Sequence, residues 1–215
     1  MRIRSAATLL LAFTGVVLAA TGARALSLQA AFRSSTYQVT PGDTYADLMA
    51  AHLAGAPLAS VTTTALANVS AQVEAGVGTN YSILLSADLT PSVSGAFAFQ
   101  VGADWGRGGV AAVLDADGAV LQELVRSDDI WWSNNWNHPD VFTTSVNLTA
   151  GSAYTLVWLG FEGCCGGVTT IRFSYEGSPF VPVDETNLAP LTVPEPASLL
   201  LLVLGATGLA RRQGA

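Results

Sequence analysis

The chain has 215 residues, of which nine are basic and sixteen acidic, and its formal net charge is −7. Only four arginines lie with all sixteen acidic residues between the two ends of the chain: Arg33, Arg107, Arg126 and Arg172. Because binding a nucleic acid requires clustered Lys and Arg, this acidic central part excludes a nucleic-acid partner. An acidic surface is typical of a soluble exported domain and attracts cations, but it specifies no ligand.

The first 25 residues predict a removable export signal. Arg2 and Arg4 give a positively charged start, and residues 6–20 form an apolar run. The small-x-small sequence Ala23-Arg24-Ala25 follows, which is the pattern that signal peptidase cleaves. An uncleaved anchor or a buried helix is the alternative, although the run is short for a membrane span. We therefore expect residues 1–25 to be a secretory signal peptide.

Residues 26–178 are expected to form the body of the protein, a single domain with its own hydrophobic core. One short helix is predicted near its start, at residues 44–53, where Leu48, Met49 and Leu53 recur at helical spacing. Asp43 or Thr44 is the expected cap of this helix. Residues 58–75 are small and weakly patterned, and they are predicted to be strand and loop.

The remainder of the body has the pattern of β-strands. Asp117-Gly118 predicts a hairpin turn between two of them, because glycine accepts the positive φ that such a turn requires. Short strands separated by glycine-containing turns predict a mainly β fold, an antiparallel β-sandwich or jelly roll. The expected strands are residues 96–101, 110–114, 119–125, 141–148, 154–161 and 168–175.

The segment between two of these strands, residues 128–140, contains three tryptophans, three asparagines and three aspartates. Aromatic faces beside amides and carboxylates are how proteins bind sugars, because the ring stacks on C–H groups while polar groups bind hydroxyls. Alternatively, the tryptophans close the end of the sandwich and the polar residues cap turns. The candidate carbohydrate-binding residues are Asp128, Asp129, Trp131, Trp132 and Asn137.

Parts of the body resemble PA14-type β-sandwich domains. The resemblance rests on residues 98–106, on residues 111–118 with their Asp-x-Asp-Gly turn, and on residues 146–156. PA14-type lectins bind sugars through a calcium ion held by an Asp-Asp pair. The resemblance therefore implies a calcium-assisted carbohydrate site in which Asp128 and Asp129 are the pair.

Cys164 and Cys165 are the only cysteines, and they are adjacent. In an oxidising compartment they form a disulfide with each other, pair with another chain, or remain free. A bridge between neighbours would stiffen the glycine-rich turn at residues 163–167 without joining distant segments. The pair lacks the C-x-x-C spacing of metal sites, so metal binding is disfavoured.

Residues 179–193 are rich in proline and polar side chains, which predicts an extended spacer. The tail, residues 194–215, has three parts: Pro194-Glu195-Pro196, an uncharged Leu-rich stretch at 197–210, and Arg211-Arg212. The stretch predicts an apolar helix that begins after the prolines, with its arginines on the cytoplasmic side of a membrane. At 1.5 Å per residue it spans about 21 Å, less than the roughly 30 Å hydrocarbon core.

This tail resembles the PEP-CTERM sorting tail of Gram-negative bacteria. The resemblance implies that a membrane protease, exosortase, cleaves near the Pro-Glu-Pro motif and releases the protein to the envelope or extracellular matrix. It also implies that the tail is only a transient inner-membrane anchor; an ordinary single-pass anchor is the alternative. The segments at residues 129–132 and 160–167 are similar to a PEP-CTERM group named for a Cys-Cys-x-Gly motif, which has no assigned activity.

No enzyme signature is present. His52 and His138 stand alone, and the sequence contains no Gly-x-Ser-x-Gly elbow, zinc-protease helix or phosphate loop. We therefore expect a non-enzymatic, exported protein of the cell envelope or matrix that requires no cofactor. Its expected partners are signal peptidase and exosortase. The alternatives are a calcium-assisted carbohydrate-binding module acting on surface polysaccharide and a secreted hydrolase with an unrecognised site.

Overall fold

A computed structural model describes residues 27–188 and residue 192. The predicted export signal, the Pro-Glu-Pro motif, the apolar helix at 197–210 and the terminal arginines lie outside these described residues. Within the described part of the chain, no helix combines the length and the apolar character needed to cross a membrane.

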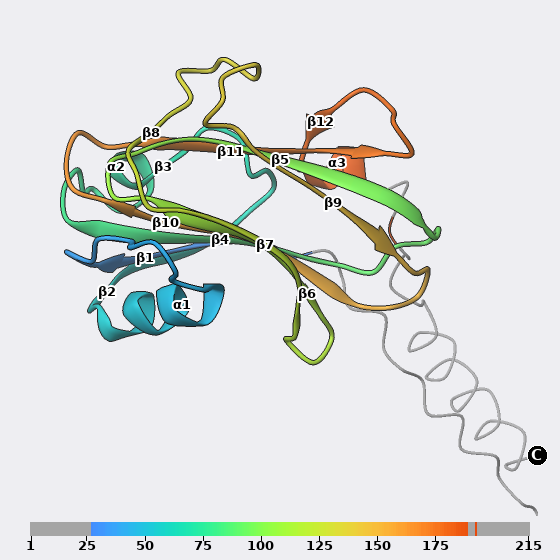
Figure 1. Ribbon diagram of the computed structural model, residues 1–215, viewed down its shortest axis with the longest axis horizontal. Helices are drawn as coiled ribbons and strands as arrows, with labels where there is room; N and C mark the ends of the chain where they lie inside the picture. The colour runs from blue at the N-terminus through green and yellow to red at the C-terminus, as the bar shows by residue number, and fades with distance from the viewer. Residues whose placement is uncertain (1–26, 189–191, 193–215) are drawn as a thin grey trace, which may run out of the picture.

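Two antiparallel β-sheets form the body, as the sequence predicts (Figure 1). The first sheet has the strand order β2-β1-β4-β10-β6-β7. Its strands are β1 (Ser27–Ser34), β2 (Pro57–Thr63), β4 (Tyr81–Leu89), β6 (Gly109–Asp115), β7 (Val120–Arg126) and β10 (Tyr154–Glu162). Each pair of neighbouring strands in this sheet is antiparallel.

The second sheet contains the order β12-β11-β5-β8, with β3 paired to β11 and β9 paired to β5. Its strands are β3 (Val69–Ser70), β5 (Gly95–Trp105), β8 (Ile130–Trp131), β9 (Phe142–Leu148), β11 (Val168–Tyr175) and β12 (Val181–Pro182). The main core lies between the two sheets. On β5, for example, Phe97, Phe99 and Val101 are buried at alternate positions, because successive side chains of a strand point to opposite faces.

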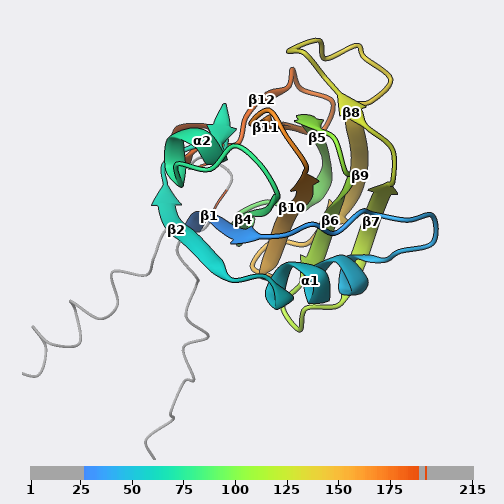
Figure 2. The same ribbon diagram turned by 90° about the vertical axis from the view of Figure 1, so that its left-hand side faces the viewer.

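Helix α1 (Tyr45–Ala54) covers the outer face of the first sheet (Figure 2). The Thr44 side chain accepts a hydrogen bond from the Asp47 backbone N–H, and the Asp47 carboxylate accepts one from the Thr44 backbone N–H. This capping box satisfies two N–H groups that a helix start otherwise leaves unpaired. Leu48 packs with Leu159 and Phe161 of β10 in a second hydrophobic cluster, so β10 is buried on both faces.

The predicted strands and the predicted first helix are confirmed, and Thr44 is the cap. Strand β2 falls in the segment predicted to be strand and loop, whereas the sequence did not indicate β1 or the short helices α2 (Ala71–Glu74) and α3 (Glu185–Leu188). The segment that we expected to be a spacer includes β12 and α3, and it places Val183 and Leu188 in the main core. Burying these two side chains stabilises the fold, so the packed body extends to Leu188.

Candidate functional site

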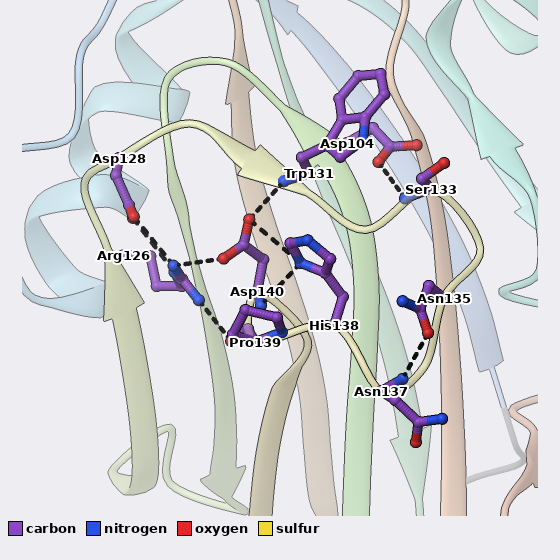
Figure 3. A network of polar contacts seen from close by, with 10 residues as sticks. All are labelled: Asp104, Arg126, Asp128, Trp131, Ser133, Asn135, Asn137, His138, Pro139 and Asp140. Atoms are coloured by element: carbon purple, nitrogen blue, oxygen red, sulfur yellow. Dashed lines mark hydrogen bonds and ion pairs between the residues drawn. The ribbon is translucent and has the colours of Figure 1, made fainter.

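The loop between β8 and β9, residues 132–141, is attached to the sandwich by a polar network (Figure 3). The Arg126 guanidinium lies 3.0 Å from Asp128 and 2.9 Å from Asp140. The second carboxylate oxygen of Asp140 accepts a hydrogen bond of 2.9 Å from the Trp131 backbone N–H. The carboxylate of Asp140, near the end of the loop, therefore binds the residue that precedes the loop and fixes the backbone of Trp131.

Asp128 points away from Trp131 and toward Arg126 (Figure 3). The hydrogen bond from Arg126 is the main reason that the pKa of Asp128 lies below its ordinary value. The same hydrogen bond, together with Asp140, raises the pKa of Arg126. Asp128 is therefore ionised and already paired with the guanidinium of Arg126.

Trp131 and Trp132 lie on opposite sides of the chain. Trp131 is 61% exposed, whereas Trp132 is 2% exposed and stacks edge-on against Trp136 with ring centroids 4.7 Å apart. Trp132 lies on the outer face of the second sheet over Gly102, where a Cβ atom would overlap the indole ring. The absence of a side chain at Gly102 thus lets the loop pack closely on β5.

A pocket of about 330 Å³ opens at the end of the sandwich where β5, β8 and β10 meet the loop before β11. We call it the disulfide pocket. The residues that line it include three acidic residues, one tryptophan and both cysteines: Asp104, Asp129, Glu162, Trp131, Cys164 and Cys165. Asp104 accepts a hydrogen bond from the Ser133 backbone N–H at 2.8 Å, whereas among the described residues no hydrogen-bond donor or cation is paired with Asp129.

Glu162 organises the floor of this pocket. It is 4% exposed and accepts backbone hydrogen bonds from Gly163 at 2.7 Å, Cys164 at 2.8 Å and Gly106 at 3.3 Å. Burial raises the pKa of Glu162, the three backbone N–H groups oppose that rise, and the charge of Asp129 adds to it. The carboxylate therefore holds the cysteine loop against the end of β5.

Cys164 and Cys165 form a disulfide with each other at the exposed rim of the pocket. Cys165 has φ +73° and Gly166 has φ +68°, a left-handed region that glycine adopts at low cost. A Cβ atom at Gly167 would overlap the backbone oxygen of Asp104. The glycines around the cysteine pair are thus required by the turn and by its close approach to β5.

The structure divides the five predicted carbohydrate-binding residues between different surroundings. Asp129 and Trp131 line the disulfide pocket. Asp128 is paired with Arg126, Trp132 packs on the sheet, and Asn137 is an exposed loop residue whose backbone N–H binds Asn135. The five therefore do not form one site, because neighbouring residues of an extended chain point in opposite directions.

The arrangement does not fit the calcium site that the resemblance implied. Asp128 and Asp129 do not converge, since Arg126 holds the first and the second faces the pocket. In residues 27–188 and 192, no three His, Cys, Asp or Glu side chains are grouped to hold a metal ion. We therefore assign no calcium ion to this site.

One Ser–His pair is present, with His52 Nδ1 2.8 Å from the Ser82 hydroxyl. Both residues are buried, His52 on α1 and Ser82 on β4. A catalytic pair must reach its substrate, and this pair lies beneath α1 inside the protein. The pair contributes to packing between the helix and the sheet.

Sequence reasoning missed Asp104, Glu162 and Arg172. Glu162 ends a strand directly before Gly-Cys-Cys-Gly-Gly, which was the only signal that an acidic side chain supports the cysteine loop. Arg172 lies in the middle of β11 and belongs to no motif. Its surroundings are formed by distant parts of the chain, so no local pattern could reveal them.

Residues 192–213 match the family described as the PEP-CTERM protein-sorting motif. The tail that we identified by resemblance is therefore shown, and it indicates an exported, cell-surface protein that exosortase sorts. No curated protein matches the chain.

Solved structures similar to this chain include PA14 domains. The PA14 sugar-binding domain from an RTX adhesin is 13% identical, with a TM-score of 0.47, covering 74% of this chain and 96% of that one. The PA14 domain of the MpAFP antifreeze protein is 11% identical, with a TM-score of 0.49, covering 76% and 90%. An anti-sigma factor domain-containing protein is 11% identical, with a TM-score of 0.50, covering 80% and 49%. At these identities the likeness concerns the fold alone.

Proposed function

We propose that this chain is a non-enzymatic protein of the cell envelope or extracellular matrix of a Gram-negative bacterium. The observation that carries the proposal is the sorting motif at residues 192–213. Signal peptidase removes residues 1–25, the apolar stretch at 197–210 holds the chain briefly in the inner membrane, and exosortase then cleaves near Pro194-Glu195-Pro196. The apolar stretch suits a transient anchor because it is shorter than the hydrocarbon core.

Mass spectrometry of the protein from its native host tests this route. We expect mature chains that begin near Leu26 and lack Arg211-Arg212. Replacing Pro194, Glu195 and Pro196 by alanine should leave the tail attached, as should deletion of exosortase. Pro179→Ala, which lies outside the matched residues, is the control and should not affect processing. Mature wild-type chains that retain both arginines would refute the sorting proposal.

We also propose that the body binds a neutral sugar of a surface polysaccharide in the disulfide pocket. Trp131 presents an indole ring that the protein leaves largely exposed, and its backbone is fixed by Asp140. A fixed ring binds with a smaller loss of conformational freedom, and its face stacks on the C–H groups of a sugar. Asp129 is available to accept hydrogen bonds from hydroxyls.

The charge of the pocket favours a neutral ligand. Asp104, Asp129 and Glu162 all line it, and an anion would be repelled by their carboxylates. The exposed disulfide of Cys164 and Cys165 adds an apolar surface at the rim, across which a sugar ring can lie. Because Asp128 is already paired with Arg126, binding through this pocket needs no calcium.

A glycan array followed by NMR titration of the best neutral saccharide tests this site. We expect Trp131→Ala to weaken binding about two- to tenfold, which corresponds to the roughly 0.5–1.5 kcal/mol of an aromatic contact. Val73→Ala, another exposed apolar residue, is the matched control and should bind like the wild type. A chelator should not change the affinity. If no neutral glycan binds, or if Trp131→Ala binds equally well, the carbohydrate proposal fails while the sorting proposal stands.

A further inference from the structure

A second pocket, also about 330 Å³, lies on the outer face of the second sheet beside the loop after β8. We call it the arginine pocket. It is lined by Asn68, Asn134, Trp136, Thr170, Arg172 and Phe180, among others, and none of its lining residues is acidic. Residues 27–188 contain fifteen acidic residues and four arginines, so a pocket lined by one arginine and no carboxylate is a locally positive site.

Arg172 is held in place by three neighbours. Its Nε donates a hydrogen bond of 2.7 Å to the Gln100 side-chain oxygen. Its guanidinium carbon lies 3.9 Å from the ring centroid of Trp136 and 5.0 Å from that of Phe180. These contacts fix the plane of the guanidinium, and the partial burial that they cause lowers the pKa of Arg172.

The two terminal nitrogens of Arg172, Nη1 and Nη2, have no acceptor among the described residues. Each of the other three arginines among the described residues donates a hydrogen bond from at least one of its terminal nitrogens. Arg33 donates to backbone oxygens, Arg107 to Ser35 and Asn80, and Arg126 to Asp128 and Asp140. Arg172 is thus the one of the four arginines in the described residues with neither Nη1 nor Nη2 hydrogen-bonded within the protein.

We propose that the arginine pocket binds the carboxylate of an acidic sugar, a uronate. The edge formed by Nη1 and Nη2 matches the two oxygens of a carboxylate, which it can bind in a bidentate manner. Trp136 and Phe180 exclude water from the guanidinium, which strengthens such a pair. The side-chain amides of Asn68 and Asn134 line the same pocket and offer both donors and acceptors to sugar hydroxyls.

This site is separate from the disulfide pocket, and it favours an anionic ligand where the disulfide pocket favours a neutral one. Three carboxylates line the disulfide pocket, whereas the arginine pocket has a single cation. Uronate binding at this site depends on Arg172 and its neighbours alone. Failure of neutral-sugar binding at Trp131 would therefore leave it unaffected, and the reverse also holds.

The test uses the full-length chain in a polyoxyethylene detergent, which has no sugar headgroup. Binding of methyl glucuronide and of methyl galacturonide is measured by isothermal titration and by the change in tryptophan fluorescence, since Trp132 and Trp136 both line the pocket. We expect saturable binding with one site per chain, at least tenfold tighter than that of the matching neutral methyl glycosides. Arg172→Gln should weaken uronate binding about tenfold or more, because hydrogen bonds to charged groups contribute roughly 1.5–3 kcal/mol.

Arg172→Lys is the conservative variant, and it guards against a folding defect in Arg172→Gln. It keeps the charge but loses the planar fork, so we expect weaker binding than wild type with an unchanged thermal midpoint. Asp129→Asn, in the disulfide pocket, is the control and should bind uronate normally. Equal affinity for uronate and neutral glycoside, equal affinity for acetate and uronate, or unchanged uronate binding in both Arg172 variants would overturn the proposal.

Discussion

Gly102 leaves room for the indole ring of Trp132 at the start of the loop between β8 and β9, and Gly102→Ala tests this role. A Cβ atom at this position would lie 2.7 Å from the indole Nε1 of Trp132 and closer still to two ring carbons. Trp132 is buried between β5 and Trp136, so its ring must move away from the sheet by a distance of about an ångström to reach ordinary contact. Overpacking of this kind costs about 1–3 kcal/mol.

Thermal unfolding of the full-length chain measures this cost. In a domain of this size, a loss of about 1–3 kcal/mol lowers Tm by roughly 2–12 °C. The tryptophan emission should shift to longer wavelength, because the displaced Trp132 gains contact with water. Gly78→Ala is the matched control: it meets no atom within 4 Å and does not have positive φ, so its Tm should stay close to that of the wild type.

A double variant separates steric overlap from a general effect of replacing a glycine. In a Trp132→Leu background the indole is gone, so adding Gly102→Ala should cost much less than it does in the wild type. Such non-additivity is expected for residues in direct contact. A Gly102→Ala protein with wild-type Tm and emission would refute the packing argument, and so would a full, additive cost in the Trp132→Leu background.

Two further predictions concern α1. Thr44→Ala removes one half of the capping box with Asp47 and should lower the free energy of unfolding by about 0.5–2 kcal/mol in urea titrations, whereas Thr44→Ser should restore it. Burial, and then the charge of Arg33, lowers the pKa of His52 to about 4 from an ordinary 6.5. The unfolded chain therefore binds a proton that the folded chain does not, and stability should fall as the pH drops from 6.5 toward 4, by up to about 3 kcal/mol. His52→Leu should lose less stability over this range than the wild type; equal losses would contradict the assignment.

The strands with strong side-chain patterns were predictable, and the others show why patterns fail. In β11 and β9, β-branched and aromatic residues lie between glycine-containing turns, so strand type and approximate bounds followed from sequence. In β1 the inward residues are Leu28, Ala30 and Phe32, and alanines on both faces weaken the alternation. Strands β3, β8 and β12 have two residues each, which is too short for any period to be recognised.

The candidate site was predictable only as a region. The density of tryptophan and aspartate between residues 128 and 140 singles out a segment, but composition does not say which way each side chain points. The direction of Asp128 is decided by Arg126, and the backbone of Trp131 is fixed by Asp140 from the far end of the loop. Such contacts depend on how the strands are paired, and no local sequence pattern records that pairing.

The same geometry explains how two consecutive tryptophans reach two pockets of opposite charge. Trp131 and Trp132 are consecutive, and the alternation of an extended chain sends one indole to the disulfide pocket and the other to the outer face of the sheet. The acidic residues Asp104 and Asp129 line the first pocket, whereas Arg172 is the only charged residue that lines the second. If both proposals hold, the two sides of this segment therefore select sugars of different charge, a neutral one beside Trp131 and a uronate beside Arg172.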